Sequence, residues 1–456
     1  MGSVEAPDLD LSENFYNVIN GEKRSNSRKS HGTNPSTMEQ LPEVPIASSQ
    51  DLDDAVRGSR AAFAEWSEVP VEKRKALVNA FADALAVHSE QFARLLTLEQ
   101  GKPLPLAQGD IKIGVLRARE LCNLGLPEMT RLEDERRRAI LSYTPLGVCA
   151  LIVPWNFPIS LGTQKIASAL VTGNTVILKP SPFTPFCGLK LGELAQQFFP
   201  PGVFQVLNGD DELGPWITAH PGIDKISFTG SIATGKKVMQ NASRTLKRVT
   251  LELGGNDPCI ICDDVNIEET VAKVATMSFL NSGQVCIGVK RIYVQENVYD
   301  QFLAAFVEHV KTLRLGDGFE DGVFVGPLQN KQQYEIAQRF LSDIENQNLK
   351  VVLGGSAVST RPGLFIAPTV VDRPPDTSDL VKEEPFGLGG SVWSKDIARA
   401  TRIARKLQVG TAWINEHGAL DPRVPFSGLK ESGYGTELGI EGLKAFCNTK
   451  VIFVPK

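Results

Sequence analysis

A cysteine and a glutamate, each beside glycines, are the residues of this sequence best suited to nucleophilic chemistry. Cys286 follows a Ser-Gly turn in LNSGQVC, and Glu252 stands in LELGGNDP, at the end of a predicted strand and before a Gly-Gly pair. A thiolate attacks electrophilic carbon, and a carboxylate at the mouth of an α/β sheet can take up a proton. Taken singly, the cysteine equally fits an inert buried thiol and the glutamate a solvated loop carboxylate.

A third candidate is Asn156 in VPWNFPI, where Pro154 and Pro158 stiffen an irregular segment after an apolar strand. Its side-chain amide can donate a hydrogen bond to an oxyanion. The alternative is a structural turn in which the asparagine side chain binds its own backbone. The segment alone leaves both interpretations open.

The segment FTGSIATGKK at 228–237 predicts a strand that turns into a helix at Gly230. Small residues at such a turn let phosphate oxygens reach the N–H groups of the positive helix end. Three interpretations stay open: a dinucleotide site without the usual GxGxxG, a tight structural turn, and the phosphate loop of a nucleotide hydrolase. The last is weakened because Lys237 stands where that loop needs Ser or Thr to bind Mg²⁺.

Strands and helices alternate between residues 147 and 253, and this alternation would position the candidate residues. Apolar runs such as VCALIVPW, TVILKP and KISFTG are separated by segments with helical periodicity. A second alternating series begins at CIICDD. The pattern predicts an α/β fold with two doubly wound parallel-sheet domains. The polar segment 22–38 is expected to be a surface loop.

Composition excludes several classes of protein. The chain of 456 residues has 48 Lys and Arg against 53 Asp and Glu, a net charge of −5, so it lacks the basic field of a nucleic-acid or anionic-membrane binder. It contains no apolar run long enough to span a membrane and no signal-peptide pattern. Seven scattered cysteines favour reduced thiols, so we expect a cytoplasmic protein. The lone CxxC and the absence of HExxH predict no metal site.

Seven segments, taken together and in order, resemble the NAD(P)+-dependent aldehyde dehydrogenase superfamily, including its fold. They are PWNFP at 154–158, GNTVILKP at 173–180, FTGS at 228–231, LELGG at 251–255, GQVC at 283–286, EEPFG at 383–387 and PFSGLKESGYGTELG at 425–439. The segment KPSPFTP is similar to a broad-specificity branch whose substrates are poorly assigned.

The resemblance implies oxidation of an aldehyde to a carboxylic acid. Cys286 would attack the aldehyde carbon, and Asn156 would hold the oxyanion of the thiohemiacetal. Glu252 would activate the water that hydrolyses the resulting thioester. Lys165 and Glu437 stand at the positions of a proton relay behind that base. Glu252 also argues against an acylating member that passes the thioester to coenzyme A.

The resemblance also implies a dinucleotide cofactor. Its adenosine half would lie on Ile152, Pro154, Trp155 and Lys179, its phosphates on Phe228, Gly230 and Ser231, and its nicotinamide riboside on Glu384 and Phe386. Pro182 occupies the place of an acidic residue found in many NAD-selective members, so no carboxylate repels a 2′-phosphate. We expect NAD, with NADP left open.

One departure from the family pattern lies in EEPFGLGGSVW at 383–393. In the family, a block long enough for a strand and a helix separates the two halves of this segment, whereas here Gly387 joins directly to Leu388. Lost strand pairing leaves buried backbone groups unpaired, at about 1–3 kcal/mol each. The alternative function is therefore a catalytically impaired member of the family.

The resemblance further implies a division of the chain into three parts. Residues 1–126 and 147–253 would form a Rossmann-like cofactor domain, and 254–436 the catalytic domain. Residues 127–146 and 437–456 would form an oligomerisation element. We expect a homodimer or homotetramer whose partner molecule is a small aldehyde, bound in a tunnel lined by Leu161 and residues near 415–425.

Overall fold

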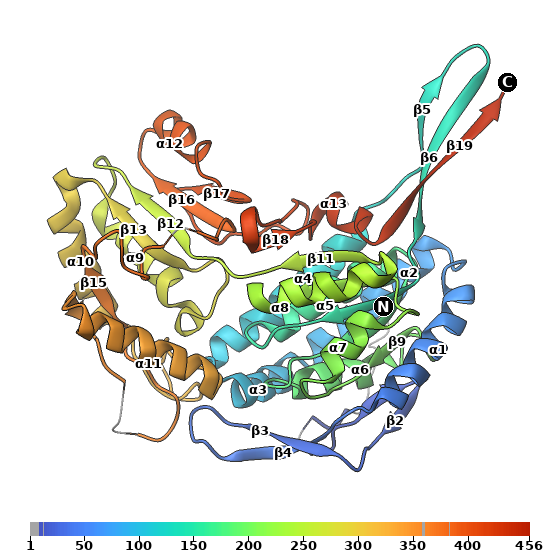
Figure 1. Ribbon diagram of the computed structural model, residues 1–456, viewed down its shortest axis with the longest axis horizontal. Coiled ribbons are helices and arrows are strands. Elements are labelled where there is room, and N and C mark those ends of the chain that lie inside the picture. Colours follow the sequence, from blue (N-terminus) through green and yellow to red (C-terminus); the bar gives the residue numbers. More distant parts are fainter. Residues whose placement is uncertain (1–8, 12, 358–360, 383) are drawn as a thin grey trace.

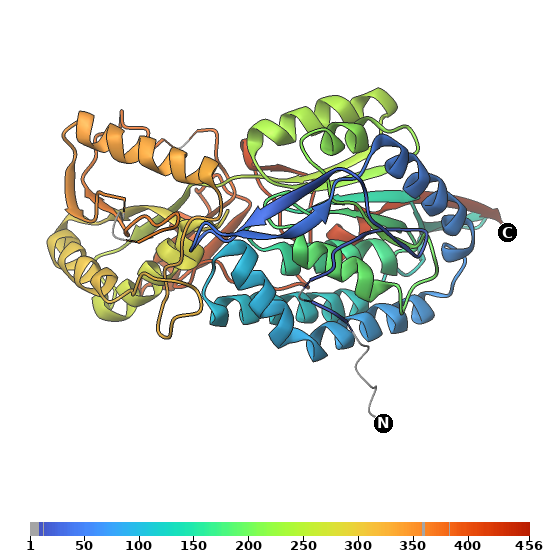
Figure 2. The ribbon, with the colours of Figure 1, turned by 90° about the horizontal axis from the view of Figure 1, so that it is seen from below.

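The computed structural model describes residues 9–11, 13–357, 361–382 and 384–456. They form a larger and a smaller α/β body, with a β arm projecting from the larger one (Figure 1). Figure 2 shows helices on both faces of the larger body. The predicted α/β class with two parallel sheets is confirmed. None of the helices in the described ranges is long and apolar enough to cross a membrane.

The larger sheet has eight strands in the order β18-β11-β10-β7-β8-β9-β1-β2. Its five central strands are parallel, and β7, β8 and β10 are completely buried, which is why their sequences are continuous apolar runs. The strands of this sheet are β1 Asn17–Ile19, β2 Glu22–Arg24, β7 Val148–Ile152, β8 Thr175–Lys179, β9 Phe204–Val206, β10 Lys225–Thr229, β11 Arg248–Glu252 and β18 Gly433–Tyr434.

Helices cover this sheet. The helix α5, Pro158–Val171, is buried at nearly every residue, because the larger body's core surrounds it. The others are α1 Ser49–Trp66, α2 Val71–Val87, α3 Ser89–Gln100, α4 Leu104–Asn123, α6 Phe186–Ala195, α7 Leu213–Ala219 and α8 Ile232–Ala242.

The predicted surface loop at 22–38 is wrong in part. It contains β2 and β3, and β3, Lys29–Thr33, forms an antiparallel hairpin with β4, Gln40–Pro45. Most side chains of β3 are exposed or half-buried, so no apolar alternation marks the strand in the sequence.

The smaller sheet has four parallel strands in the order β13-β12-β16-β17. They are β12 Asp257–Ile261, β13 Val289–Val294, β16 Gly389–Trp393 and β17 Thr411–Ile414. Beside them are the helices α9 Ile267–Phe279, α10 Tyr299–Lys311, α11 Lys331–Asn346 and α12 Ile397–Ala404, and the hairpin of β14 Lys350–Leu353 and β15 Val370–Asp372.

The β arm consists of β5 Met129–Glu133, β6 Arg137–Pro145 and β19 Cys447–Pro455. The strand β19 runs antiparallel to β6 over its whole length, from Cys447 opposite Pro145 to Pro455 opposite Arg137. A short helix, α13 Gly439–Lys444, leads from β18 into β19. The two segments expected to form an oligomerisation element thus share one sheet, while their role in assembly and the domain boundaries stay predictions.

The junction at Gly387 and Leu388 is packed into the protein. The N–H of Gly387 donates to the Ser432 hydroxyl over 2.9 Å, and its carbonyl accepts from Leu429 over 2.8 Å. The carbonyl of Leu388 accepts from Thr411 over 3.2 Å, and its side chain is buried. These contacts anchor the start of β16 to its neighbours at the joint itself.

Candidate active site

The predicted site residues of the larger sheet meet at one edge. Because the central strands are parallel, their carboxyl ends lie together: Glu252 ends β11, Lys179 ends β8, Gly230 follows β10 and Asn156 follows β7. The strand order reverses between β7 and β10, which is the place where open α/β sheets bind ligands.

Glu252 is a buried carboxylate beside the Cys286 thiol and the Thr229 hydroxyl. Only 3% of its surface is exposed, and neither carboxylate oxygen has a hydrogen bond of regular distance and angle among the described residues. Burial and, after it, the nearby charge of Glu437 raise the pKa of Glu252 to about 8, against the lowering effect of Cys286, Lys165 and Thr229. A carboxylate with that pKa is suited to take up and release protons near neutral pH.

Cys286 is the one cysteine of the described chain that is not fully buried. Burial and the neighbouring Glu252 carboxylate hold the pKa of its thiol well above the ordinary value, while the N–H of Ile287 lowers it. The thiol therefore needs a base to become a nucleophile. Glu252 is close enough to affect the thiol's pKa, and the reverse holds as well.

The turn before Cys286 has an unusual backbone. Asn281, Ser282 and Gly283 all have positive φ values, of 50°, 59° and 74°. Two non-glycine residues in this region store local strain, which clusters at functional sites. The Asn281 side chain donates to the carbonyls of Asn156 and Gln284, at 3.3 and 3.4 Å, and so ties the turn to the segment after β7.

The structure shows the turn interpretation of Asn156, and its role as an oxyanion donor stays a prediction. Its Oδ1 accepts from the N–H of Phe157 over 3.0 Å, as in a structural turn. This bond fixes the amide so that Nδ2 donates to the carbonyl of Gln284, also over 3.0 Å, two residues before Cys286. The donor is thus aimed at the cysteine loop, where an oxyanion would form.

Behind Glu252 lies a buried network centred on Glu437. Lys165 forms an ion pair with Glu437 and donates to the Ser227 hydroxyl over 3.0 Å. Gln164 donates to the other Glu437 oxygen over 2.6 Å. The predicted pair Lys165 and Glu437 is therefore in contact, and its charges act on the pKa of Glu252.

Sequence reasoning missed several residues that support the site. Lys102 is completely buried, donates to the backbone carbonyl of Asn156 over 2.7 Å and pairs with Asp110 at 3.3 Å. Asp110 in turn accepts from the N–H of Ser160, near the start of α5. These residues lie on or just before α4, about fifty positions before Asn156, and no local pattern connects them to it.

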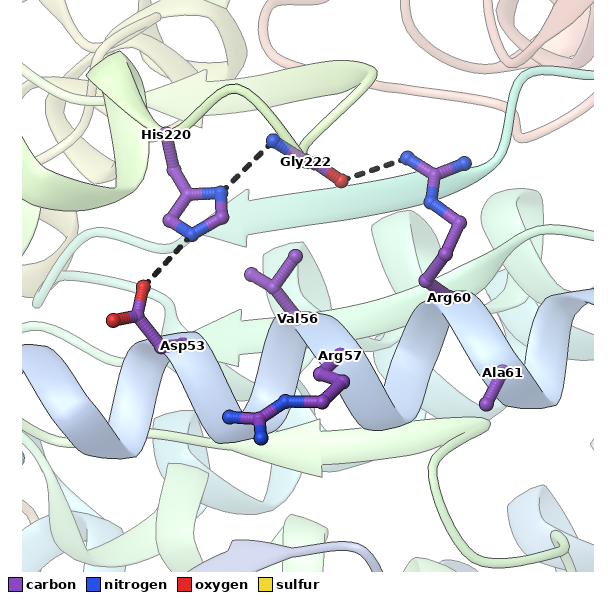
Figure 3. A pocket seen from close by; sticks show the side chains of 7 residues that line it. All are labelled: Asp53, Val56, Arg57, Arg60, Ala61, His220 and Gly222. Atoms are coloured by element: carbon purple, nitrogen blue, oxygen red, sulfur yellow. Dashed lines mark hydrogen bonds and ion pairs between the residues drawn. The ribbon is translucent and has the colours of Figure 1, made fainter.

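A pocket of the larger body lies elsewhere. Figure 3 shows His220 between Asp53 of α1 and Gly222, which lies just before the amino end of β10. Arg60 donates to Gly222 and to Asp224. These groups satisfy one another, and they lie at the sheet edge opposite to Glu252, so this pocket is not part of the candidate site.

The sequence and fold of this chain match those of known proteins. The model of the aldehyde dehydrogenase family matches residues 23–387 and 385–452, in two segments that meet at the junction. The chain belongs to the aldehyde dehydrogenase family. A putative aldehyde dehydrogenase FUS7 of Gibberella fujikuroi is 41% identical over 97% of this chain and 99% of that protein. The mitochondrial succinate-semialdehyde dehydrogenase of Arabidopsis thaliana is 35% identical over 92% of this chain and 85% of that protein.

Solved structures agree. A betaine aldehyde dehydrogenase of Staphylococcus aureus in complex with NAD+ is 31% identical, with a TM-score of 0.92 over 96% of this chain and 97% of that chain. An NADP-dependent enzyme of E. coli is 30% identical, with a TM-score of 0.94 over 98% of this chain and 100% of that chain. The protein is an NAD(P)-dependent aldehyde dehydrogenase. This membership removes the nucleotide-hydrolase interpretation of residues 228–237, where Lys237 is exposed on α8.

The aldehyde dehydrogenase presents groups that fit an NAD(P) cofactor. Lys179 is buried, its pKa is lowered to about 8 by burial, and its hydrogen bond to Pro180 is long at 3.4 Å, so its ammonium is free for ribose hydroxyls. A Cβ at Gly230 would lie 2.5 Å from the Phe228 ring, so any larger residue there requires the ring to shift. Ser231 caps α8 and leaves its N-terminus open to phosphate.

Four of the remaining cofactor candidates of the enzyme border the same edge. Ile152 ends β7, and Pro154 and Trp155 follow it, half-buried. Phe386 lies next to Gly254, just beyond Glu252, since a Cβ at that glycine would be 3.7 Å from its ring. Glu384 is mostly exposed and pairs with Lys430 at 2.8 Å, while its neighbour Glu383 lies outside the described residues. No cluster that could hold a metal ion occurs within the described ranges.

Proposed function

We propose that this aldehyde dehydrogenase oxidises its substrate through a covalent adduct on Cys286, which water activated by Glu252 then hydrolyses. The observation that carries the proposal is the buried Glu252 carboxylate, without regular hydrogen bonds, beside a thiol that needs a base. Burying a carboxylate without regular hydrogen bonds is unfavourable for stability alone, which points to chemistry as the reason for its position.

In the first step, Glu252 takes the proton from the Cys286 thiol, and the sulfur forms a bond to the aldehyde carbon. The carbonyl oxygen gains the electron pair of the broken π bond. The Nδ2 of Asn156 and the backbone N–H of Cys286 would donate to this oxyanion. When bound, the nicotinamide ring supplies a hydride acceptor, and the adduct on Cys286 then becomes a thioester.

In the second step, Glu252 takes a proton from water, and the oxygen attacks the thioester carbon. The carbon–sulfur bond breaks, Cys286 leaves as a thiolate, and the carboxylic acid is released. Lys165 and Glu437, in contact behind Glu252, would carry the proton onward. Charge on Glu437 raises the pKa of Glu252, so the network also sets the strength of the base.

We propose an apolar aldehyde as the substrate and NAD+ as the cofactor. Leu161, Val285 and Leu420 are half-buried and pack on the same core as Cys286. No lysine or arginine cluster in the motifs indicates a second carboxylate on the substrate. Pro182 repels neither NAD+ nor NADP+. The ratio of the oxidation rates with the two cofactors therefore tests the proposed preference for NAD+ directly.

We propose a homo-oligomer in the cytoplasm, paired through the β arm. Val451, Ile452 and Phe453 of β19 are between 41% and 57% exposed. Because side chains alternate along a strand, Val451 and Phe453 share one face of β19 and give it an apolar surface suited to a second copy of the chain.

The test is formation of reduced cofactor by the purified 456-residue chain with a panel of aldehydes. We expect turnover that disappears in Cys286→Ala while cofactor binding survives. Normal turnover by that variant would refute the nucleophile. A folded wild-type chain that binds cofactor but oxidises none of the aldehydes would favour the impaired alternative, for which the split family match at 385–387 is the specific observation.

A further inference from the structure

The parallel part of the larger sheet has five strands, whereas the smaller sheet has four. In the larger sheet, β7 is central, β8 and β9 follow on one side, and the chain then crosses to β10 and β11 on the other. This is the doubly wound order 3-2-1-4-5. In the smaller sheet, β12 is central, β13 lies on one side, and β16 and β17 lie on the other. The counterpart of β9 is missing, and its place is the free edge of β13.

The sequence points to the same strand. A third strand would belong between β13 and β16 along the chain, and the Gly387–Leu388 junction lies directly before β16. The family match divides at 385–387. The alignment with the Gibberella fujikuroi relative is 468 residues long, although this chain has 456 residues, so that relative carries residues without counterparts here.

Apolar side chains around β13 lack cover. Tyr293 is 46% exposed, and Ile292 and Val294 are only partly buried, whereas β7, β8 and β10 are fully buried. The helix α11 buries a single residue, Ile344, and its Phe340 is 39% exposed. Half-covered residues on a sheet edge and on a helix indicate a missing layer.

The hairpin β14–β15 belongs to the same region. Leu353 and Val370 pack on the same core cluster as Ile292 and Val294. Tyr299, at the start of α10, donates to Asp372 at the end of β15 over 2.5 Å, and so ties the hairpin to the segment that follows β13. Among the described residues, β13 pairs with no strand other than β12.

We propose that the free edge of β13 is a docking site for one parallel β-strand followed by an amphipathic helix. The strand would bond to the edge backbone of β13, and the helix would cover Tyr293 and Phe340. The occupant is the unit that the relatives carry in cis between their counterparts of Gly387 and Leu388. A longer form of this protein with that unit would have a complete five-stranded sheet.

The test compares the 456-residue chain with a form that carries the residues of the Gibberella fujikuroi relative between Gly387 and Leu388. Hydrogen–deuterium exchange is measured for peptides covering 289–294 and 331–346. We expect exchange in 289–294 to slow by about tenfold or more in the longer form, because its edge amides become bonded. Peptides covering 411–414, in the opposite edge strand, should not change.

A glycine–serine insert of the same length is the control for opening the junction, and it should protect neither region. Protection of 411–414 in place of 289–294 would overturn the proposal, as would a folded longer form without new protection. If the longer form does not fold, the unit is added as a synthetic peptide to the 456-residue chain, and absence of protection in 289–294 then overturns it. The readout is independent of turnover, so it does not depend on the proposed function.

Discussion

The Nζ of Lys102 lies 2.7 Å from the backbone carbonyl oxygen of Asn156, and both the lysine and its partner Asp110 are fully buried. A fully buried ammonium between a carboxylate, a carbonyl and the Phe157 ring, 3.8 Å away, fixes the backbone at the oxyanion donor. This contact connects the stability of α4 to the geometry of the reaction.

Lys102→Met should therefore reduce both stability and turnover. Breaking a buried ion pair leaves Asp110 uncompensated, which destabilises by about 3–5 kcal/mol. Urea unfolding measures the first effect and kcat the second. Lys112→Met, at an exposed position of α4, is the matched control and should change neither. The double variant Lys102→Met/Asp110→Leu should restore stability but leave kcat low. Full recovery of kcat in this variant would show that Lys102 does not position Asn156.

The rate of the proposed reaction should rise with pH through about 8, since Glu252 must be deprotonated to act as a base and its pKa is raised to about 8. Glu437→Gln should move this inflection to lower pH, because a negative charge that raises the Glu252 pKa is removed. A pH–rate profile of kcat for both proteins checks the prediction. An inflection that stays in place, or moves upward, contradicts it.

Gly230→Ala should weaken cofactor binding. The added methyl group would lie 2.5 Å from the Phe228 ring, so the ring or the turn before α8 has to move. We expect a loss of about tenfold in affinity, or about 1.4 kcal/mol, by titration with NADH. Gly109→Ala and Gly214→Ala add a Cβ that meets no atom within 4 Å, and they should bind NADH as the parent does.

Stability should fall as pH rises from about 4.5 to about 7, in part because of Glu99. This carboxyl group accepts from the N–H groups of Phe186 and Cys187, and burial raises its pKa from 4.5 to about 7. The folded state therefore holds a proton that the unfolded state has lost, a loss of about 3 kcal/mol across this window. Urea unfolding at several pH values should show a smaller slope for Glu99→Gln; an unchanged slope excludes this group.

Phe453→Lys with Val451→Lys should produce monomers, since the exposed apolar end of β19 is replaced by charge. Light scattering after size exclusion measures the mass. Lys450→Glu, at the neighbouring exposed position, is the control and should leave the oligomer intact. An oligomer that survives both lysines would place the interface elsewhere.

Much of the site could be predicted because the sequence patterns are local. The apolar runs located β7, β8 and β10, and parallel pairing then placed Asn156, Gly230 and Glu252 at one edge. Lys165 and Glu437 came from family resemblance alone. Their contact joins α5 to a segment 272 residues further along the chain, which no periodicity reveals.

The features that the sequence did not predict depend on tertiary contacts. Strand β3 is too exposed to show an apolar alternation, and the support of Asn156 by Lys102 depends on how α4 packs against α5. The missing block was expected to leave an unmatched strand neighbour, and the sequence did not show where this edge would lie. In the structure the joint has partners in Ser432, Leu429 and Thr411, and the unmatched strand edge lies at β13.

The path from β18 to β19 has a practical consequence for anyone who alters this protein's C-terminus. Glu437 lies between β18, which pairs with the strand of the base, and β19, which builds the arm. A purification tag, a proteolytic cut or a frameshift that loosens the last twenty residues would therefore reach the acid–base network directly. Loss of activity in such a protein would report on catalysis and on assembly at the same time.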